Sequence, residues 1–133
     1  MKINYLAVFV ATVASMVFGW AWYGLVFGER WCALLGKTMA EMQNVSPTIY
    51  LWPFLSSLVG AVVLGWILPK LGSMSLMNGI KYSLLIAIPF TLLCGLTTNA
   101  FSMRPFELGM IDQAHNVLQY VLIGAIMGAM PKK

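Results

Sequence analysis

Four long apolar runs, separated by short polar segments, fill most of the chain. They predict helices over residues 5–27, 48–68, 76–100 and 105–130, each with about 20 or more mainly apolar residues. At about 1.5 Å per residue, a helix of this length crosses the roughly 30 Å hydrocarbon core of a bilayer. We therefore predict an all-α bundle of four transmembrane helices, forming a single transmembrane domain over residues 1–133.

The longest polar interval between these runs covers residues 28–46. Within it, Thr38 and Glu41 have the spacing of a capping box, in which each side chain accepts a hydrogen bond from the backbone of the other. Trp31 suits the membrane–water interface, where indole rings are enriched. We predict a short interfacial helix over about residues 38–45, lying on the membrane surface.

Composition supports a membrane protein and argues against a soluble protein and a nucleic-acid-binding protein. Hydrophobic residues make up 60% of the chain and charged residues 9%, too few charges to cover the surface of a soluble protein. The net charge of +4 is scattered along the chain, so it forms no basic face for nucleic acid. The expected surroundings are the lipid bilayer, and no nucleic-acid partner is expected.

The distribution of basic residues predicts the orientation. Four helices place both termini on one side, and that side carries five basic residues: Lys2, Lys70, Lys81, Lys132 and Lys133. The other side carries three basic residues and all four acidic ones: Arg30, Lys37, Arg104, Glu29, Glu41, Glu107 and Asp112. Because cytoplasmic loops are enriched in Lys and Arg, both termini are predicted to be cytoplasmic. The first apolar run is too long for a signal peptide and is expected to be the first span.

Small residues recur at every fourth position on three of the predicted helices, which lets helices approach closely in lipid. These stripes are Ala7, Ala11, Ser15 and Gly19 in the first helix, Ser57, Ala61 and Gly65 in the second, and Gly124 and Gly128 in the fourth. A compact bundle can use two such faces internally. The third would then suit contact with another subunit, so we predict a homo-oligomer or a larger membrane assembly.

Pro89 lies in the middle of the predicted helix over residues 76–100. Proline cannot donate its backbone hydrogen bond and its ring clashes with the preceding turn, so the helix should kink there. The kink could be purely structural or could serve as a hinge for gating.

The main candidate for chemistry is a polar row on the last predicted helix: Asp112, His115, Asn116 and Gln119. Their spacing of three, four and seven residues from the first places them on one helical face. Asn99 and Arg104 precede this helix and can face the row, with Arg104 as an expected partner of Asp112 or Glu107.

Three interpretations fit this row. It can be a hydrogen-bonded network that fixes how the helices pack, or a solute or proton site that opens outward, since histidine carries protons near neutral pH. It can also be a metal site, although one histidine and one carboxylate make only two good ligands. We expect no resident metal or cofactor. The chain is also not expected to be an enzyme, because it carries no nucleophile, phosphate-loop or cofactor motif.

A set of aromatic, glycine and polar residues gives the chain a family resemblance. These residues are Trp22-Tyr23-Gly24, Phe27-Gly28, Trp31, Leu35-Gly36-Lys37, Asn99, Arg104-Pro105 and Gly124. In them the chain resembles a bacterial membrane family, domain of unknown function 1761, along nearly its whole length. The resemblance implies a four-helix protein of about this length in the bacterial cytoplasmic (inner) membrane, with no agreed activity. It does not extend to Asp112 and His115.

Two functional hypotheses follow. The first is a non-enzymatic subunit of an oligomer or larger membrane assembly, which the small-residue stripes and the short loops favour. The alternative is a transporter or channel for a small solute, an ion or protons, with an outward-facing polar site at the start of the last helix.

Overall fold

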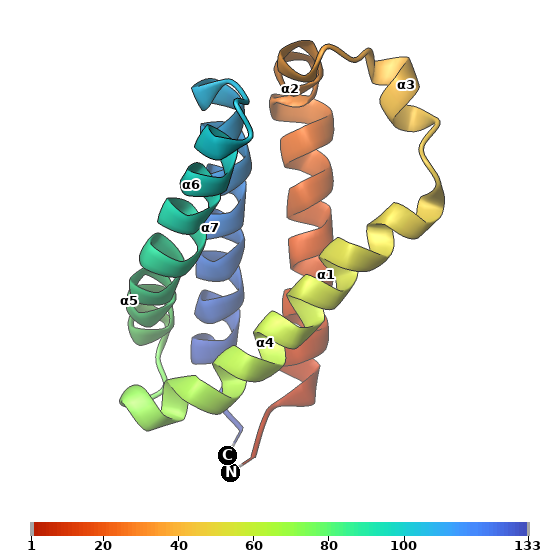
Figure 1. Cartoon of the computed structure of the whole chain (residues 1–133). Helices are drawn as coiled ribbons and strands as arrows, with labels where there is room; N and C mark the ends of the chain where they lie inside the picture. The colour runs from red at the N-terminus through yellow and green to blue at the C-terminus, as the bar shows by residue number, and fades with distance from the viewer. Residues whose placement is uncertain (1, 133) are drawn as a thin grey trace.

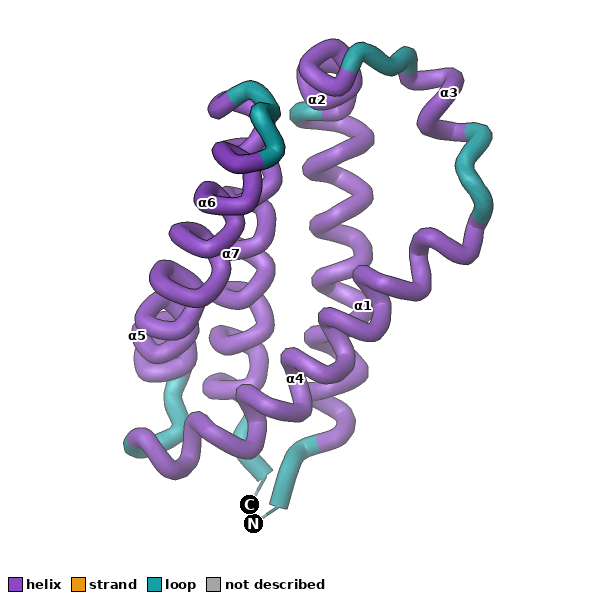
Figure 2. Tube along the Cα trace, in the orientation of Figure 1, coloured by secondary structure: helices purple, strands orange, loops and turns teal. Residues whose placement is uncertain are grey.

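The computed structural model describes residues 2–132, and within that range it is built of helices without any strand (Figures 1 and 2). In chain order the elements are α1 (Tyr5–Trp20), the π-helix η1 (Ala21–Val26), α2 (Gly28–Leu35), α3 (Met39–Gln43), the 3-10 helix η2 (Pro47–Tyr50), α4 (Leu51–Leu71), α5 (Leu76–Ala87), the π-helix η3 (Ile88–Leu93), α6 (Cys94–Phe101) and α7 (Phe106–Ala129).

Helix α7 is the centre of the bundle. The continuous rod of α5, η3 and α6 packs along it, and α1 packs against it from another side. Helix α4 crosses α1 diagonally and also contacts α7 (Figure 1). The two ends of the chain lie together at the base of the bundle, where Asn4 Nδ2 donates to the Met130 carbonyl over 2.9 Å.

Three helical segments, not four, are long and apolar enough to cross a membrane within the part of the chain that the structure describes. They are Tyr5–Val26, Pro47–Leu71 and Leu76–Phe101. The expectation of four transmembrane helices is therefore wrong by this criterion for α7, which has 24 residues but a polar first half. The physical reason is that α7 directs its polar side chains, such as His115 and Gln119, into the protein rather than toward lipid.

The segment before α4 contains more helix than the sequence analysis predicts. Residues expected to form a loop instead form α2, which ends at Gly36 with a left-handed φ of 72°. The capping box at Thr38 and Glu41 is present with both of its hydrogen bonds, of 2.7 and 3.2 Å, and it begins the short helix α3. Helix α4 continues through Pro69 to Leu71, past its expected end at residue 68.

The predicted helix over residues 76–100 is interrupted around Pro89. The α-helical pattern gives way there to the π-helical turns of η3 before it resumes in α6. A wider turn accommodates a residue that cannot donate a backbone hydrogen bond. The proline thus marks a real irregularity, and its use as a hinge stays a prediction.

All three small-residue stripes are used inside this one chain. Ala11 of α1 and Ala61 of α4 are fully buried in one core cluster with Ile123 and Met127 of α7. Gly124 faces α5, where an added Cβ would lie only 1.8 Å from Ser83 Oγ. The expectation of a third face left over for another subunit is therefore wrong, because the compact packing of α7 needs all three. The small-residue stripes therefore do not support the predicted oligomer.

Candidate functional site

The candidate site lies where η1 and α2 meet the first half of α7, at the end of the bundle away from the termini (Figure 1). Asp112 of α7 is its centre. The Oδ1 atom of Asp112 accepts hydrogen bonds from Tyr23 Oη at 2.7 Å and from Trp31 Nε1 at 2.8 Å. One carboxylate oxygen therefore ties together α7, the π-helical turn and α2.

The π-helical turn η1 brings two consecutive aromatic side chains to α7. Trp22 Nε1 donates to the Ile111 carbonyl over 3.1 Å, next to the bond from Tyr23 to Asp112. Gly28 lets the chain turn back closely here, because an added Cβ at this position would lie 2.4 Å from the Tyr23 carbonyl oxygen. Single π-helical turns are frequent at functional sites.

His115 lies one turn further along α7 and is only 7% exposed. Its ring stacks on Phe18, with centroids 5.2 Å apart and planes 5° apart, and meets Trp22 and Tyr23 at centroid distances of 6.2 and 5.0 Å. Gly19 lies beside the ring, since an added Cβ there would meet His115 Nε2 at an ordinary contact distance of 3.4 Å. The imidazole is therefore enclosed by α1 and η1.

The two ring nitrogens of His115 differ in their surroundings. Nδ1 lies 3.2 Å from Asn116 Oδ1, and because an amide oxygen can only accept, this contact assigns the hydrogen to Nδ1. The Asn116 amide is oriented by its own donation to Gln113 Oε1 over 3.2 Å. Nε2 is buried and has no hydrogen-bond partner within residues 2–132. In the neutral ring it is a free acceptor.

Gln119 continues the polar row and is 6% exposed. Its Nε2 donates to Ser57 Oγ over 3.1 Å, and Ser57 Oγ donates to the Pro53 carbonyl over 2.8 Å, so the row reaches α4. Ser15 of α1 is 3% exposed, and its Oγ also has no partner among the residues that the structure describes. His115 Nε2 and Ser15 Oγ are thus two of four buried polar atoms that stay unsatisfied within residues 2–132, a costly situation; the others are Ser83 Oγ and Asn99 Oδ1.

Two of the predicted site residues have other roles. Asn99 is buried and donates to the carbonyls of Arg104 and Pro105 at 3.3 and 3.1 Å, so it closes the turn before α7. The expectation that Arg104 pairs with Asp112 or Glu107 is wrong. Glu107 forms a two-point ion pair with Arg30 of α2 instead, and this hydrogen bonding lowers the pKa of the exposed Glu107 carboxyl.

The aromatic half of the site was not predicted from the sequence. Trp31 was expected only as an interfacial anchor, Trp22 and Tyr23 entered only through the family resemblance, and Ser15 only through the small-residue stripe. The available signal was chemical, since indole and phenol groups are hydrogen-bond donors and a partly buried carboxylate on a facing helix needs such donors.

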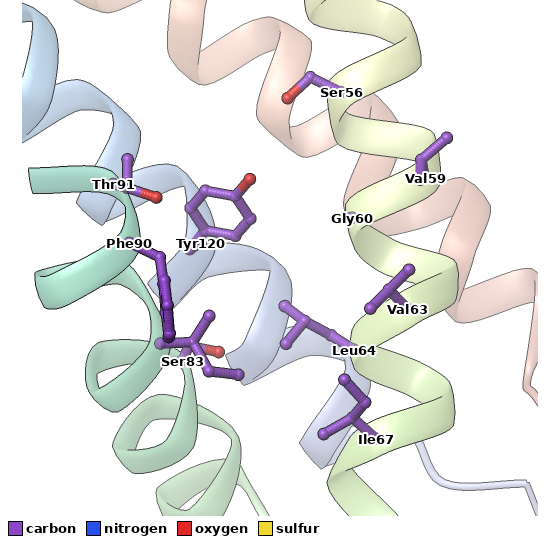
Figure 3. A pocket seen from close by; sticks show the side chains of 11 residues that line it. Ser56, Val59, Gly60, Val63, Leu64, Ile67, Ser83, Phe90, Thr91 and Tyr120 are labelled. Carbon is purple, nitrogen blue, oxygen red and sulfur yellow. The ribbon is translucent and has the colours of Figure 1, made fainter. Parts of the chain in front are cut away.

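A groove of about 410 Å³ lies elsewhere, between α4 and the wall made by α5, η3 and α7. Figure 3 shows Phe90, Thr91 and Tyr120 on one side of it and Gly60 and Val63 on the other. The residues that line it include neither Asp112 nor His115. The polar row is therefore a closed interface, separate from this groove.

Comparison with known proteins places most of the chain in one family. Residues 6–128 match the model of a family described as "Protein of unknown function (DUF1761)". The matched range contains both the aromatic residues and the whole polar row. No curated protein and no solved structure matches the chain.

Proposed function

Because the chain belongs to the DUF1761 family of proteins of unknown function, we propose its function from its own site. We propose a small multi-pass membrane protein that carries a small solute, an ion or protons, with Asp112, His115 and Gln119 along its path. The observation that carries this proposal is the buried Nε2 atom of His115, which has no partner within residues 2–132.

Burying an unsatisfied polar atom costs about 1–3 kcal/mol, so a merely structural network would be expected to satisfy it. A neutral phenylalanine in place of His115 could fill the same space beside Phe18 and Trp22 without that cost. Ionisable side chains buried against membrane helices, as His115 is against Phe18 of α1, often serve transport or proton transfer. The free acceptor therefore supports a site at which something binds.

The groups beside His115 would partly offset the cost of burying the imidazole as a cation. Ring faces attract a positive charge, and the imidazole lies against Phe18, Trp22 and Tyr23. The Asp112 carboxylate, one helical turn away, adds a negative charge. A site that tolerates both forms of histidine is suited to binding and releasing a cation or a proton.

Passage through the site requires movement, because His115 is closed off from both sides of the bundle in this conformation. The π-helical turn η1 is the natural moving part, since it holds Tyr23 against Asp112 and its hydrogen-bond pattern can shift by one residue. The irregular turn η3 at Pro89 offers a second hinge in the neighbouring rod.

The membrane location and orientation belong to the same proposal. We place the protein in the bacterial inner membrane with both termini in the cytoplasm, because five of its eight basic residues lie on the terminal side. The ends of the chain are joined by Asn4 and Met130, which supports a shared side. The polar site then faces the outer half of the membrane.

A second candidate function is a non-enzymatic subunit of a larger membrane assembly. The groove beside α4 favours it, because Gly60 and the small residue Ser56 leave a hollow along a membrane helix that a partner could fill. In that case the polar row would only fix how α1 and α7 pack.

Flux measurements on purified protein in lipid vesicles separate the two candidates. The variants His115→Phe and Asp112→Asn are compared with Thr97→Val, which removes an exposed hydroxyl of α6 that donates to the Leu93 carbonyl of its own rod. A panel of protons, Na⁺, K⁺ and small neutral solutes serves as the probe set. The proposal expects at least one species to cross with wild type and Thr97→Val and to be lost with the site variants, all four proteins staying monodisperse. Equal flux in all four proteins, or loss of folding as the only effect, would refute it.

A further inference from the structure

The row from Asp112 to Gln119 offers almost no room for a solute. His115 is 7% exposed, and three aromatic rings lie at centroid distances of 5.0 to 6.2 Å from it. On its fourth side, beside Gly19, one added carbon would lie in ordinary van der Waals contact with Nε2 at 3.4 Å, so the space there holds about one small atom. A species that binds at Nε2 must therefore be about the size of a water molecule or smaller.

The donor set also disfavours a metal ion. Three or four ligands are usual even for the smallest protein metal sites, and His115 would supply only one nitrogen. The Oδ1 atom of Asp112 already accepts two hydrogen bonds. Within residues 2–132, no group of three His, Cys, Asp or Glu side chains lies close enough to hold a metal.

His115 Nε2 and Ser15 Oγ are two of the four buried side-chain atoms without a partner among the described residues; the other two are Ser83 Oγ and Asn99 Oδ1. Gly19 of α1 lies beside His115 Nε2, and Ser15 shares its helical face four residues earlier. Helical spacing therefore puts Ser15 about one turn, or roughly 5 Å, from Gly19 along α1. Both atoms are buried, and neither has a partner among the described residues.

A single water molecule that lay between the two atoms would satisfy both. A hydroxyl both donates and accepts, and the neutral Nε2 accepts, so a water between them would have two to three polar partners with the nearby Gln119 amide. Buried waters typically occupy such positions.

We infer that the species handled at this site is the proton, and that it reaches His115 Nε2 through a water held by Ser15. This inference rests on the proposed function and names its substrate. The step is a reversible proton transfer: the water-borne proton forms a bond to Nε2, the imidazole becomes an imidazolium, and release reverses both changes. Ser15 is a positioning residue, because it acts through the water.

The charged and titratable groups around His115 come from few elements. Asp112 faces it from α7 and Tyr23 from η1, while Phe18 and Gly19 of α1 are uncharged. Arg104 in the turn before α7 adds a positive charge near Tyr23. The Asp112 carboxylate is thus the group that offsets the imidazolium charge.

The chain has a single histidine, so labelling histidine with ¹⁵N reports on His115 alone. The test measures its ring signals by NMR for the full chain in lipid nanodiscs between about pH 5 and pH 8, the range in which histidine ordinarily titrates. The expected result is a neutral form with hydrogen on Nδ1, which gains a proton on Nε2 as the pH falls. Ser15→Ala should slow proton exchange at Nε2 roughly tenfold or more.

Thr12→Val is the matched control. It also removes a buried hydroxyl from α1, but that hydroxyl donates to the Val8 carbonyl of its own helix, so exchange at Nε2 should stay at the wild-type rate. A ring that stays in one form throughout the titration, or equal exchange in Ser15→Ala and wild type, would overturn the inference.

The vesicle assay distinguishes a failure of the proton inference from a failure of the proposed transport function. If His115 titrates as described but vesicles pass none of the tested species, the proton site stands and transport fails. If vesicles pass a solute while His115 stays neutral, transport stands and the proton assignment fails.

Discussion

Tyr23 donates its phenolic hydrogen to Asp112 over 2.7 Å, a contact between residues 89 positions apart in the chain. It joins the aromatic motif after α1 to the polar row of α7. Tyr23 and Trp31 are among the residues that carry the family resemblance, and Asp112 is not. Their side chains nevertheless form one structural unit. The predictions below test what this unit contributes.

Replacing Tyr23 by Phe removes one of the two donors to Asp112 Oδ1 and leaves Trp31 alone. We expect a loss of about 1–3 kcal/mol in the free energy of unfolding, because a partly buried carboxylate loses a charge-assisted hydrogen bond. Denaturant unfolding in detergent micelles measures it. Tyr82→Phe is the control, since its hydroxyl bonds to the Leu71 carbonyl at an exposed position and should matter less. Equal stability of the two variants would contradict the role of Tyr23.

Replacing Gly28 by Ala should disturb the site from the backbone. The new Cβ would lie 2.4 Å from the Tyr23 carbonyl, so η1 or α2 must shift, at a cost of about 2 kcal/mol or more. Gly24→Ala is the matched control, because its Cβ would meet the Trp20 ring only at an ordinary contact of 3.8 Å. Thermal unfolding followed by circular dichroism compares them, and an unchanged Gly28→Ala midpoint would mean that the turn is not tightly constrained.

The Arg30–Glu107 ion pair should make the tie between α2 and α7 pH-dependent. Its hydrogen bonding lowers the pKa of Glu107 in the folded state, so its contribution is present above the ordinary Glu value of about 4.3 and is lost as the pH falls further. The effect should be small and weakened by salt, since both side chains are exposed. Hydrogen exchange of α2 amides, compared at about pH 6 and pH 3.5 in wild type and Glu107→Gln after correction for intrinsic rates, measures it. Identical pH dependence in both proteins would show that the Arg30–Glu107 ion pair does not hold α2 against α7.

The proposed orientation predicts on which side of the membrane a fused reporter is active. A fusion at the C-terminus should be active only as a cytoplasmic reporter, and one inserted after Gly36 only as an exported reporter. Removing the charge bias by Lys70→Gln and Lys81→Gln leaves three basic residues on each side and should give mixed orientations. An exported C-terminal reporter in the unaltered chain would invert the proposed topology.

The sequence predicts those features that depend on local pattern. The apolar runs indicate the long helices, and the spacing of Thr38 and Glu41 identifies a capping box whose two hydrogen bonds are present. The polar row is also local, because Asp112, His115 and Gln119 share one helical face through their spacing alone.

Other features depend on contacts between distant segments and could not be predicted in this way. Periodicity does not say that Tyr23 and Trp31, rather than Arg104, would contact Asp112. Helix α2 was missed because its charged residues, Glu29 and Arg30, interrupt the apolar pattern. The use of all three small-residue stripes within one chain depends on how α4 crosses α1, which no single helix reveals.

If the enclosed histidine carries the proton across the membrane, proton flux must depend on its imidazole. Proton uptake into vesicles with a trapped pH-sensitive dye, driven by an imposed potential, is measured for wild type, His115→Phe and Thr97→Val. We expect uptake with wild type and Thr97→Val, and a loss of tenfold or more with His115→Phe while the protein stays folded. Undiminished uptake through His115→Phe would contradict it.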